Sequence, residues 1–384
     1  MKKRLGDYIQ EYSVRNKSGE DIPVYSITNS QGFCRDYFSK EVASKDKTSY
    51  KIVPRGCFAY NPSRINVGSL DWQRDEERVI VSPLYNVFSV SPEIDQQYLY
   101  YYLKSSATSY RIKEVATGSV RDNLRLSMLY DFMIELPSLD VQRQIVSNLD
   151  LLASIIRQRN QQLTKLDELI KARFVEMFGD LVENPKQFPC VLLGSIMTVM
   201  PQNGLYKPQS AYVQDKFGTP ILRIDGFYNG KVTNFNNLKR LCCTDFEKER
   251  YLLVENDIVI NRVNSIEYLG KCARISGLQE DTVFESNMMR FHLDDSKVNS
   301  TYITTVLCSQ YIYRQILTRA KKAVNQASIN QGDVQSLNVV VPPLPLQNQF
   351  AAFVAEVDKS KVEVQKALDQ TQLLFDSLMQ QYFG

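Results

Sequence analysis

Two long stretches of the chain repeat apolar residues at alternating intervals of three and four positions. One stretch covers residues 138–179 and the other covers residues 343–384. This heptad pattern predicts two amphipathic helices, each with an apolar seam that packs against another helix. The residues expected in the seams are Leu149, Leu152, Ile156, Leu163, Leu166, Ile170, Val354, Val357, Val364, Leu368, Phe375 and Leu378.

Two polar residues interrupt each predicted seam, Arg159 and Arg173 in the first helix and Lys361 and Thr371 in the second. A helix of about 38 residues is roughly 57 Å long. Because a helix of this length cannot bury its seam alone, the simplest expectation is that the two helices pack on each other. A pair of core helices inside one domain is the alternative.

The two helical stretches belong to an internal repeat. Residues 136–179 align with residues 341–384 without a gap, at a constant offset of 205 (341 minus 136). Both copies open with the pattern P-x-L-x-x-Q-x-Q and close with Phe-Gly. Weaker similarity upstream predicts a duplicated plan of globular domain and long helix. The upstream pairs are residues 118–137 with 323–342, 97–105 with 301–309, 22–27 with 219–224, and 4–9 with 192–197.

The globular segments combine short strands with helices. Residues 23–27, 78–90 and 257–263 are rich in β-forming residues and are bounded by turns, which is typical of strands. One helix is expected from about residue 94 to 114, and its counterpart from about 299 to 320. The predicted fold class is α+β, with two tandem mixed α/β domains and two long helices that form an antiparallel coiled coil with pseudo-two-fold symmetry. The expected bounds are 1–137 and 180–342 for the domains, and 138–179 and 343–384 for the helices.

Charge and composition narrow the possible partners. The chain has 384 residues with 46 basic and 43 acidic side chains, so its formal net charge is only +3. Binding to nucleic acid would therefore need local clusters of charge. No apolar run reaches the about 18 residues of a membrane span, and the first residues lack the apolar core of a secretory signal. Seven cysteines without a C-x-x-C pair indicate a reducing compartment, so we expect a cytoplasmic protein without a membrane partner.

Known catalytic motifs are missing from the sequence. Residues 61–64 (NPSR) lack the second proline and the aromatic residue of an adenine methyltransferase motif, and residues 226–232 (GFYNGKV) are one position short of a phosphate-binding loop. The acidic pairs at 76–77 and 294–295 lie in polar, turn-like contexts, which favours solvated surface over a metal site. The single histidine, His292, is expected to be packed in a strand. The chain is therefore interpreted as a binding protein with neither a catalytic nor a metal site.

Polar clusters occur at matching places in the two copies. They combine arginine, which can bond guanine O6 and N7, with asparagine and glutamine, which can bond adenine N6 and N7. A pair of lysines beside the last cluster would suit phosphates. For any single member, an ordinary turn residue is the alternative, and the matched occurrence is what favours DNA. The candidate DNA-binding residues are Asn61, Arg64, Asn66, Ser119, Arg121, Asn123, Arg125, Arg262, Asn264, Lys321, Lys322, Asn325, Gln326 and Asn330.

These features together resemble the DNA specificity subunit of type I restriction-modification systems. The resemblance covers the whole chain and rests on the helix starts at Pro137–Gln144 and Pro342–Gln349 and on the two Phe-Gly ends. Residues 60–69 (YNPSRINVGS), 81–88 (VSPLYNVF) and 184–189 (NPKQFP) also look like parts of that family's recognition domains. The tandem architecture is more specific than any one of these motifs.

The resemblance implies two target recognition domains and two helical spacers packed antiparallel. Such a subunit has no catalytic activity of its own and binds a bipartite double-stranded DNA target, in which two specified parts flank an unspecified gap. It recruits two methyltransferase (modification) subunits that methylate adenine, and restriction subunits add ATP-driven translocation and cleavage in phage defence. S-adenosylmethionine, ATP and Mg are therefore expected in partner subunits, and no cofactor is expected in this chain.

Two other functions stay open at this point. A duplicated protein-interaction scaffold on a coiled coil would show no salt-dependent affinity for DNA. A fused enzyme would cut or methylate DNA unaided. The second long helix carries three basic and five acidic residues. This weak charge is a departure from a chain that binds DNA tightly by itself.

Overall fold

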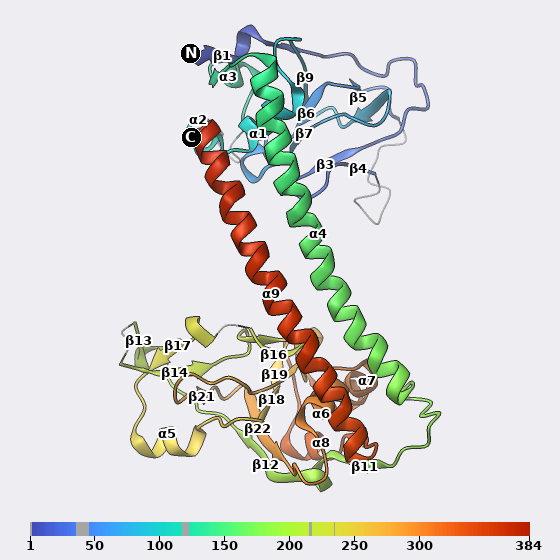
Figure 1. The fold of residues 1–384 in the computed structure, drawn as a ribbon, viewed down its shortest axis with the longest axis vertical. Coiled ribbons are helices and arrows are strands. Elements are labelled where there is room, and N and C mark those ends of the chain that lie inside the picture. Colours follow the sequence, from blue (N-terminus) through green and yellow to red (C-terminus); the bar gives the residue numbers. More distant parts are fainter. Residues whose placement is uncertain (1, 36–45, 117–122, 215–216, 234) are drawn as a thin grey trace. The chain divides into compact units, whose positions relative to one another are not determined.

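The chain folds into two compact units, seen in the computed structural model of Figure 1. Unit 1 contains the residues up to 162 together with residues 363–384, and unit 2 contains residues 163–362. Two 40-residue helices, α4 (Leu139–Phe178) and α9 (Leu344–Phe383), therefore contribute to both units. The structure describes residues 2–35, 46–116, 123–214, 217–233 and 235–384.

Unit 1 is built around an antiparallel four-stranded sheet. In spatial order the strands are β2 (Ile9–Glu11), β9 (Asn86–Val90), β6 (Phe58–Tyr60) and β7 (Leu70–Trp72). Phe58 and Phe88 lie opposite each other on β6 and β9, and their buried rings stack with centroids 5.1 Å apart. Three two-stranded sheets accompany this core: β1 (Lys2–Arg4) with β10 (Met133–Glu135), β3 (Ser26–Thr28) with β4 (Gly32–Cys34), and β5 (Lys51–Pro54) with β8 (Arg78–Val81).

Unit 2 repeats this plan. In spatial order, the strands of its largest sheet are β12 (Met197–Asn203), β22 (Met288–Leu293), β18 (Ile258–Asn261), β20 (Cys272–Arg274), β16 (Gly230–Val232) and β15 (Phe227–Tyr228). The first four of these strands pair antiparallel, as the four strands of the unit 1 sheet do. Strand β11 (Cys190–Leu192) pairs with β25 (Asn338–Val340) as β1 pairs with β10. The duplication is thus visible in the order and direction of the strands. Unit 2 also contains β13 (Tyr212–Val213), β17 (Lys239–Leu241), β14 (Thr219–Leu222) and β21 (Val283–Phe284), which form a second sheet, and helix α5 (Asp245–Tyr251).

The prediction of one continuous helix at about 94–114 and another at about 299–320 is wrong. Each is two helices: α1 (Gln96–Lys104) and α2 (Ser106–Val115), then α6 (Ser300–Leu307) and α7 (Gln310–Arg319). Ser105 and Ser309 stand at the junctions in extended backbone, and each hydroxyl accepts a hydrogen bond from the backbone N–H three residues on. A serine that caps the second helix interrupts the hydrogen-bond ladder of the first, although the apolar pattern continues past it.

A buried glutamine joins the start of α4 to unit 1. Gln142 donates from Nε2 to the backbone carbonyls of Glu93 and Pro137, at 3.0 and 2.9 Å. Its Oε1 accepts a bond of 2.9 Å from the N–H of Asp95, the residue that caps α1. One fully buried amide therefore holds the end of a loop, the start of α1 and the start of the long helix together.

Unit 2 contains the same arrangement. Gln347 is fully buried, donates to the carbonyl of Pro342 at 2.7 Å and accepts from the N–H of Asn299 at 2.9 Å, and Asn299 caps α6. This contact explains why the first glutamine of the P-x-L-x-x-Q-x-Q pattern recurs. The second glutamines, Gln144 and Gln349, are exposed.

The phenylalanine at the end of each long helix closes the core of a unit. Phe178 of α4 packs against Tyr302 in unit 2, and Phe383 of α9 packs against Tyr98 in unit 1, with ring centroids 4.7 and 5.1 Å apart. Each tyrosine donates its hydroxyl to a backbone carbonyl, at 2.9 and 2.8 Å respectively. Burial raises the pKa of Tyr98 to about 12, so its phenol stays protonated as a donor. Gly179, with φ of +79°, ends α4 in the left-handed conformation that glycine favours.

Along the two long helices, the predicted seam positions are shielded from solvent and their neighbours are exposed, as helix packing requires. All the predicted seam residues are buried or half-buried, whereas the neighbouring Leu151 and Leu373 are 63% and 73% exposed. In unit 1, Arg159 donates to the hydroxyl of Thr371. The burial pattern therefore gives each helix one apolar side.

Two other polar interruptions also have partners. In unit 2, Lys361 of α9 pairs with Asp167 of α4, and the Arg173 guanidinium lies 5.7 Å from the ring centroid of Phe353. Both charged groups therefore contact the facing helix within the same unit, Lys361 through an ion pair and Arg173 through an aromatic ring, which limits the cost of placing them beside the seam.

We predict that Gln347→Ala lowers the free energy of unfolding by about 2–3 kcal/mol, because it leaves the half-buried N–H of Asn299 and the buried carbonyl of Pro342 without partners. Gln142→Ala should cost a similar amount. The matched control is Gln349→Ala, an exposed position that should stay within about 0.5 kcal/mol of the unsubstituted protein. Urea unfolding followed by circular dichroism measures all three. Equal stability of Q347A and Q349A would contradict the role given to the buried amide.

Candidate nucleic-acid interface

In unit 1 the structure brings two of the predicted polar clusters together. Residues 61–64 form a turn in which the Asn61 side chain accepts the N–H of Ser63 at 3.0 Å. The Ser63 hydroxyl then donates to Oδ1 of Asn123 at 2.6 Å, and the N–H of Leu124 donates to a carbonyl of the turn at 3.1 Å. Segments 60 residues apart in the sequence thus form one surface.

A buried tyrosine supports this surface from below. Tyr60 is fully buried at the end of β6, and its hydroxyl donates to the carbonyl of Leu124 at 3.0 Å while accepting from the Asn86 amide at 2.9 Å. Burial raises the pKa of Tyr60, so the phenol remains the donor that this contact needs. The two loops are therefore positioned by the sheet and not only by each other.

The predicted residues differ in what they can offer a ligand. Arg64 and Arg125 are exposed, while Asn61, Asn66 and Asn123 are half-buried. The side-chain oxygens of Asn61 and Asn123 accept hydrogen bonds within the loops, which is the ordinary function of a turn residue. Ser119 and Arg121 lie outside the described residues.

Unit 2 brings its clusters together through a small sheet. Strand β24 (Ala327–Ser328) lies between β19 (Val263–Asn264) and β23 (Lys321–Lys322), and both neighbours pair with it antiparallel. The N–H of Ile329 donates to the carbonyl of Arg262 at 3.0 Å and extends this contact. The arginine-asparagine cluster that follows β18 therefore meets the cluster that precedes α8 (Gln331–Gln335).

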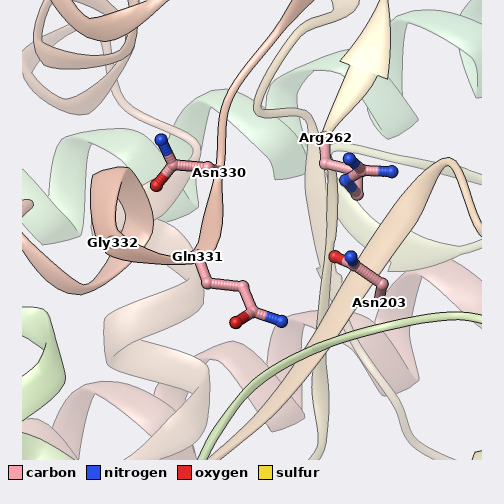
Figure 2. Close-up of a pocket in the computed structure, with 5 residues that line it drawn as sticks. All are labelled: Asn203, Arg262, Asn330, Gln331 and Gly332. Atoms are coloured by element: carbon pink, nitrogen blue, oxygen red, sulfur yellow. The ribbon is translucent and has the colours of Figure 1, made fainter.

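A pocket of about 350 Å³ opens between these segments and is lined by Asn203, Arg262, Asn330, Gln331 and Gly332. Figure 2 shows the amides of Asn203 and Gln331 pointing toward one another across it. Arg262 donates to the carbonyl of Ser286 at 3.1 Å, and its Nε is buried without a partner within the described chain. The guanidinium is thus held by the Ser286 carbonyl at the wall of the pocket.

Sequence reasoning missed three members of this pocket. Gln331 and Gly332 follow the predicted Asn330, so extending that cluster by two positions would have found them. Asn203 lies at the end of β12, far away in sequence, and no signal marks it. Of the predicted residues, Lys321, Lys322, Asn325 and Gln326 are exposed, and Asn264 is half-buried. Asn330 is exposed but uses its side chain to cap α8.

The described residues hold no group of three or more His, Cys, Asp or Glu that could bind a metal. His292 lies in β22, where its Nδ1 is 2.9 Å from a carboxylate oxygen of the fully buried Asp257. Burial raises the pKa of Asp257, and bonds from the Val254 N–H and from Arg290 oppose that shift. The histidine is a packed strand residue, as predicted.

Comparison with known proteins identifies the family. The sequence pattern described as Type I restriction modification DNA specificity domain matches the chain twice, over residues 6–165 and 185–371. The chain belongs to this family. Two separate matches agree with the repeated strand order of units 1 and 2.

Individual relatives are more distant. The chain is 28% identical over 209 residues to a putative type I restriction enzyme MjaX specificity subunit of Methanocaldococcus jannaschii, covering 53% of this chain and 47% of that protein. It is 23% identical over 305 residues to the EcoKI specificity subunit of Escherichia coli, covering 74% of this chain and 64% of that protein. The alignments thus span about half to two thirds of these relatives.

Two solved structures share the fold over the whole chain. One is the crystal structure of a type I restriction-modification S subunit from M. genitalium, with a TM-score of 0.59, 14% identity and coverage of 100% of this chain and 96% of that chain. The other comes from a study of assembly and conformational transition in the type I R-M system, with a TM-score of 0.57, 17% identity and coverage of 100% and 97%.

We predict that Ser63→Ala weakens DNA binding by unit 1 several-fold while lowering the free energy of unfolding by only about 1 kcal/mol, because it removes one hydrogen bond that orders the two loops. Ser18→Ala, at an exposed serine of the same unit, is the control. Fluorescence anisotropy with a duplex that carries the target measures affinity, and thermal melting measures stability. An affinity equal to that of the control would contradict preorganisation by Ser63.

Proposed function

We propose that this chain is the sequence-specific DNA recognition subunit of a type I restriction-modification complex. One observation carries the proposal: each unit places a cluster of arginine and amide side chains at the same point of the same strand order. In unit 1 the cluster combines the segment that follows β6 with the segment that precedes α3 (Leu126–Leu129). In unit 2 it combines the segment that follows β18 with the segment that precedes α8. Membership of a DNA specificity family supports the assignment.

The two clusters would read different sequences. They share their frame, since residues 123–125 and 328–330 occupy equivalent positions, but the side chains in that frame are not the same. Direct readout depends on the donors and acceptors that meet each base edge. The proposed target is therefore bipartite, with two unrelated specified parts, and the recognition domains are residues 1–137 and 180–342.

The long helices would set the distance between these parts. We propose that residues 138–179 and 343–384 form an antiparallel coiled coil with pseudo-two-fold symmetry. The seam burial and the polar contacts within each unit support this arrangement. Local dyads of duplex DNA would then allow each domain to meet one strand of its half-site in the same orientation.

The chemistry would belong to partners. We infer that the chain is not an enzyme and that two methyltransferase subunits, bound to it, supply S-adenosylmethionine and methylate adenine. Restriction subunits that use ATP and Mg are further expected partners. In this assignment the protein works in the cytoplasm on double-stranded DNA. The scaffold alternative is not favoured, because it does not account for the family match.

Single-molecule methylation mapping tests the proposal. Deletion of the gene that encodes this chain should abolish one bipartite adenine methylation motif in the host, and complementation with the gene should restore that motif. The purified chain, assayed alone, should neither methylate nor cleave DNA. A motif that persists after deletion would contradict the proposed function.

We predict that inserting one heptad into each long helix, between residues 165 and 166 and between residues 362 and 363, lengthens the unspecified gap. Seven helical residues add about 10.5 Å, which equals about three base pairs of 3.4 Å. Matched insertions keep the seams in phase, whereas an insertion in α4 alone should destabilise the protein. Methylation mapping gives the gap, and an unchanged gap in the doubly extended protein would contradict the spacer function.

A further inference from the structure

Unit 2 carries a β-hairpin, residues 321–328, with an anchored base and an exposed tip. The turn is closed by the N–H of Ala323, which donates to the carbonyl of Gln326 at 2.7 Å and leaves Val324 and Asn325 at the tip. The base is fixed because β24 pairs with β19 and its Ala327 is only 3% exposed. Val324, in contrast, is 99% exposed.

The hairpin has the charge that a nucleic-acid partner requires. Lys321 and Lys322 are both exposed and form no ion pair within the part of the chain that the structure describes. Side chains of successive strand residues point to opposite faces, so the two lysines flank the ribbon on both sides. The sequence from Val298 to Gly332 contains four basic residues and no acidic one. Although the whole chain is nearly neutral, this segment attracts phosphate.

The hairpin and the pocket beside it differ in shape, because the hairpin protrudes and the pocket is concave. The major groove of DNA is about 12 Å wide and admits a two-stranded ribbon, which must protrude to reach base edges. A concave site cannot reach the floor of a groove, but it can receive a phosphate that projects from the duplex. The hairpin tip therefore suits bases, and the pocket with Arg262 suits the backbone.

We propose that the 321–328 hairpin enters the major groove of one half of the target, with Val324 and Asn325 against base edges and Lys321 and Lys322 on the flanking phosphates. This inference rests on the proposed function and names the groove-reading element within it. An apolar side chain at the tip can contact a thymine methyl, and an amide can bond adenine. Arg262 in the adjacent pocket binds a phosphate and adds affinity without sequence preference.

Two sets of variants of the full-length chain, assembled with the methyltransferase subunit of its host, test this division. Val324→Ala and Asn325→Ala should relax one or two positions in one half of the methylation motif, leave the other half unchanged, and weaken binding to the original target about tenfold. Lys321→Ala with Lys322→Ala should keep the motif and reduce the slope of log affinity against log salt concentration by about 1.8, or 0.9 for each phosphate contact. Arg262→Lys should likewise keep the motif.

Lys297→Ala is the matched control, because this exposed lysine of unit 2 pairs with Asp294 at 3.0 Å and should change neither motif nor salt slope. The tip variants should melt at the wild-type temperature, since Val324 lies in solvent. A lower melting temperature would show a structural function, and an unaltered motif in both tip variants would place the groove contact elsewhere. Either result overturns the inference while the proposed function stands. Persistence of the motif after deletion of the whole chain would instead remove the proposed function and the inference together.

Discussion

The aromatic contact at the end of each long helix is the constraint on which the rest of the structure depends. Phe178 completes a buried cluster with Tyr302 and Phe350 in unit 2, and Phe383 completes the equivalent cluster around Tyr98 in unit 1. Each helix starts in one unit and supplies core residues to the other. Neither unit has a complete core without a segment from the opposite half of the sequence, so the two copies of the repeat depend on each other for stability.

Hydrogen bonds from buried side chains connect the long helices to the domains and the polar loops to the sheet. The buried amides of Gln142 and Gln347 bond the starts of the long helices to the caps of α1 and α6. Tyr60 then holds the loop at Leu124 against the sheet of unit 1. The duplicated frame keeps the position of each polar cluster constant, while the side chains in the cluster vary. A frame of this kind suits a protein whose two sites must recognise different partners in the same orientation.

Much of the architecture could be predicted because it follows from local patterns. The heptad positions predicted two long helices, and α4 and α9 have nearly the expected bounds. The offset of 205 predicted a repeated unit. The break at Ser105 was missed, because a capping serine changes the backbone without changing the apolar pattern around it. The partition of each long helix between two units could not be foreseen, since it depends on long-range packing.

The candidate site was predictable only as a set of residue types. Sequence by itself determined which segments carry arginine, lysine and amide side chains, because that information is local. Tertiary structure decided that Ser63 meets Asn123 and that Asn203 and Gln331 share a pocket. It also decided that Val324 is exposed at a hairpin tip and Ala327 is buried three residues later. Contacts between segments far apart in the sequence control these outcomes, and the spacing of residues along one chain carries no record of them.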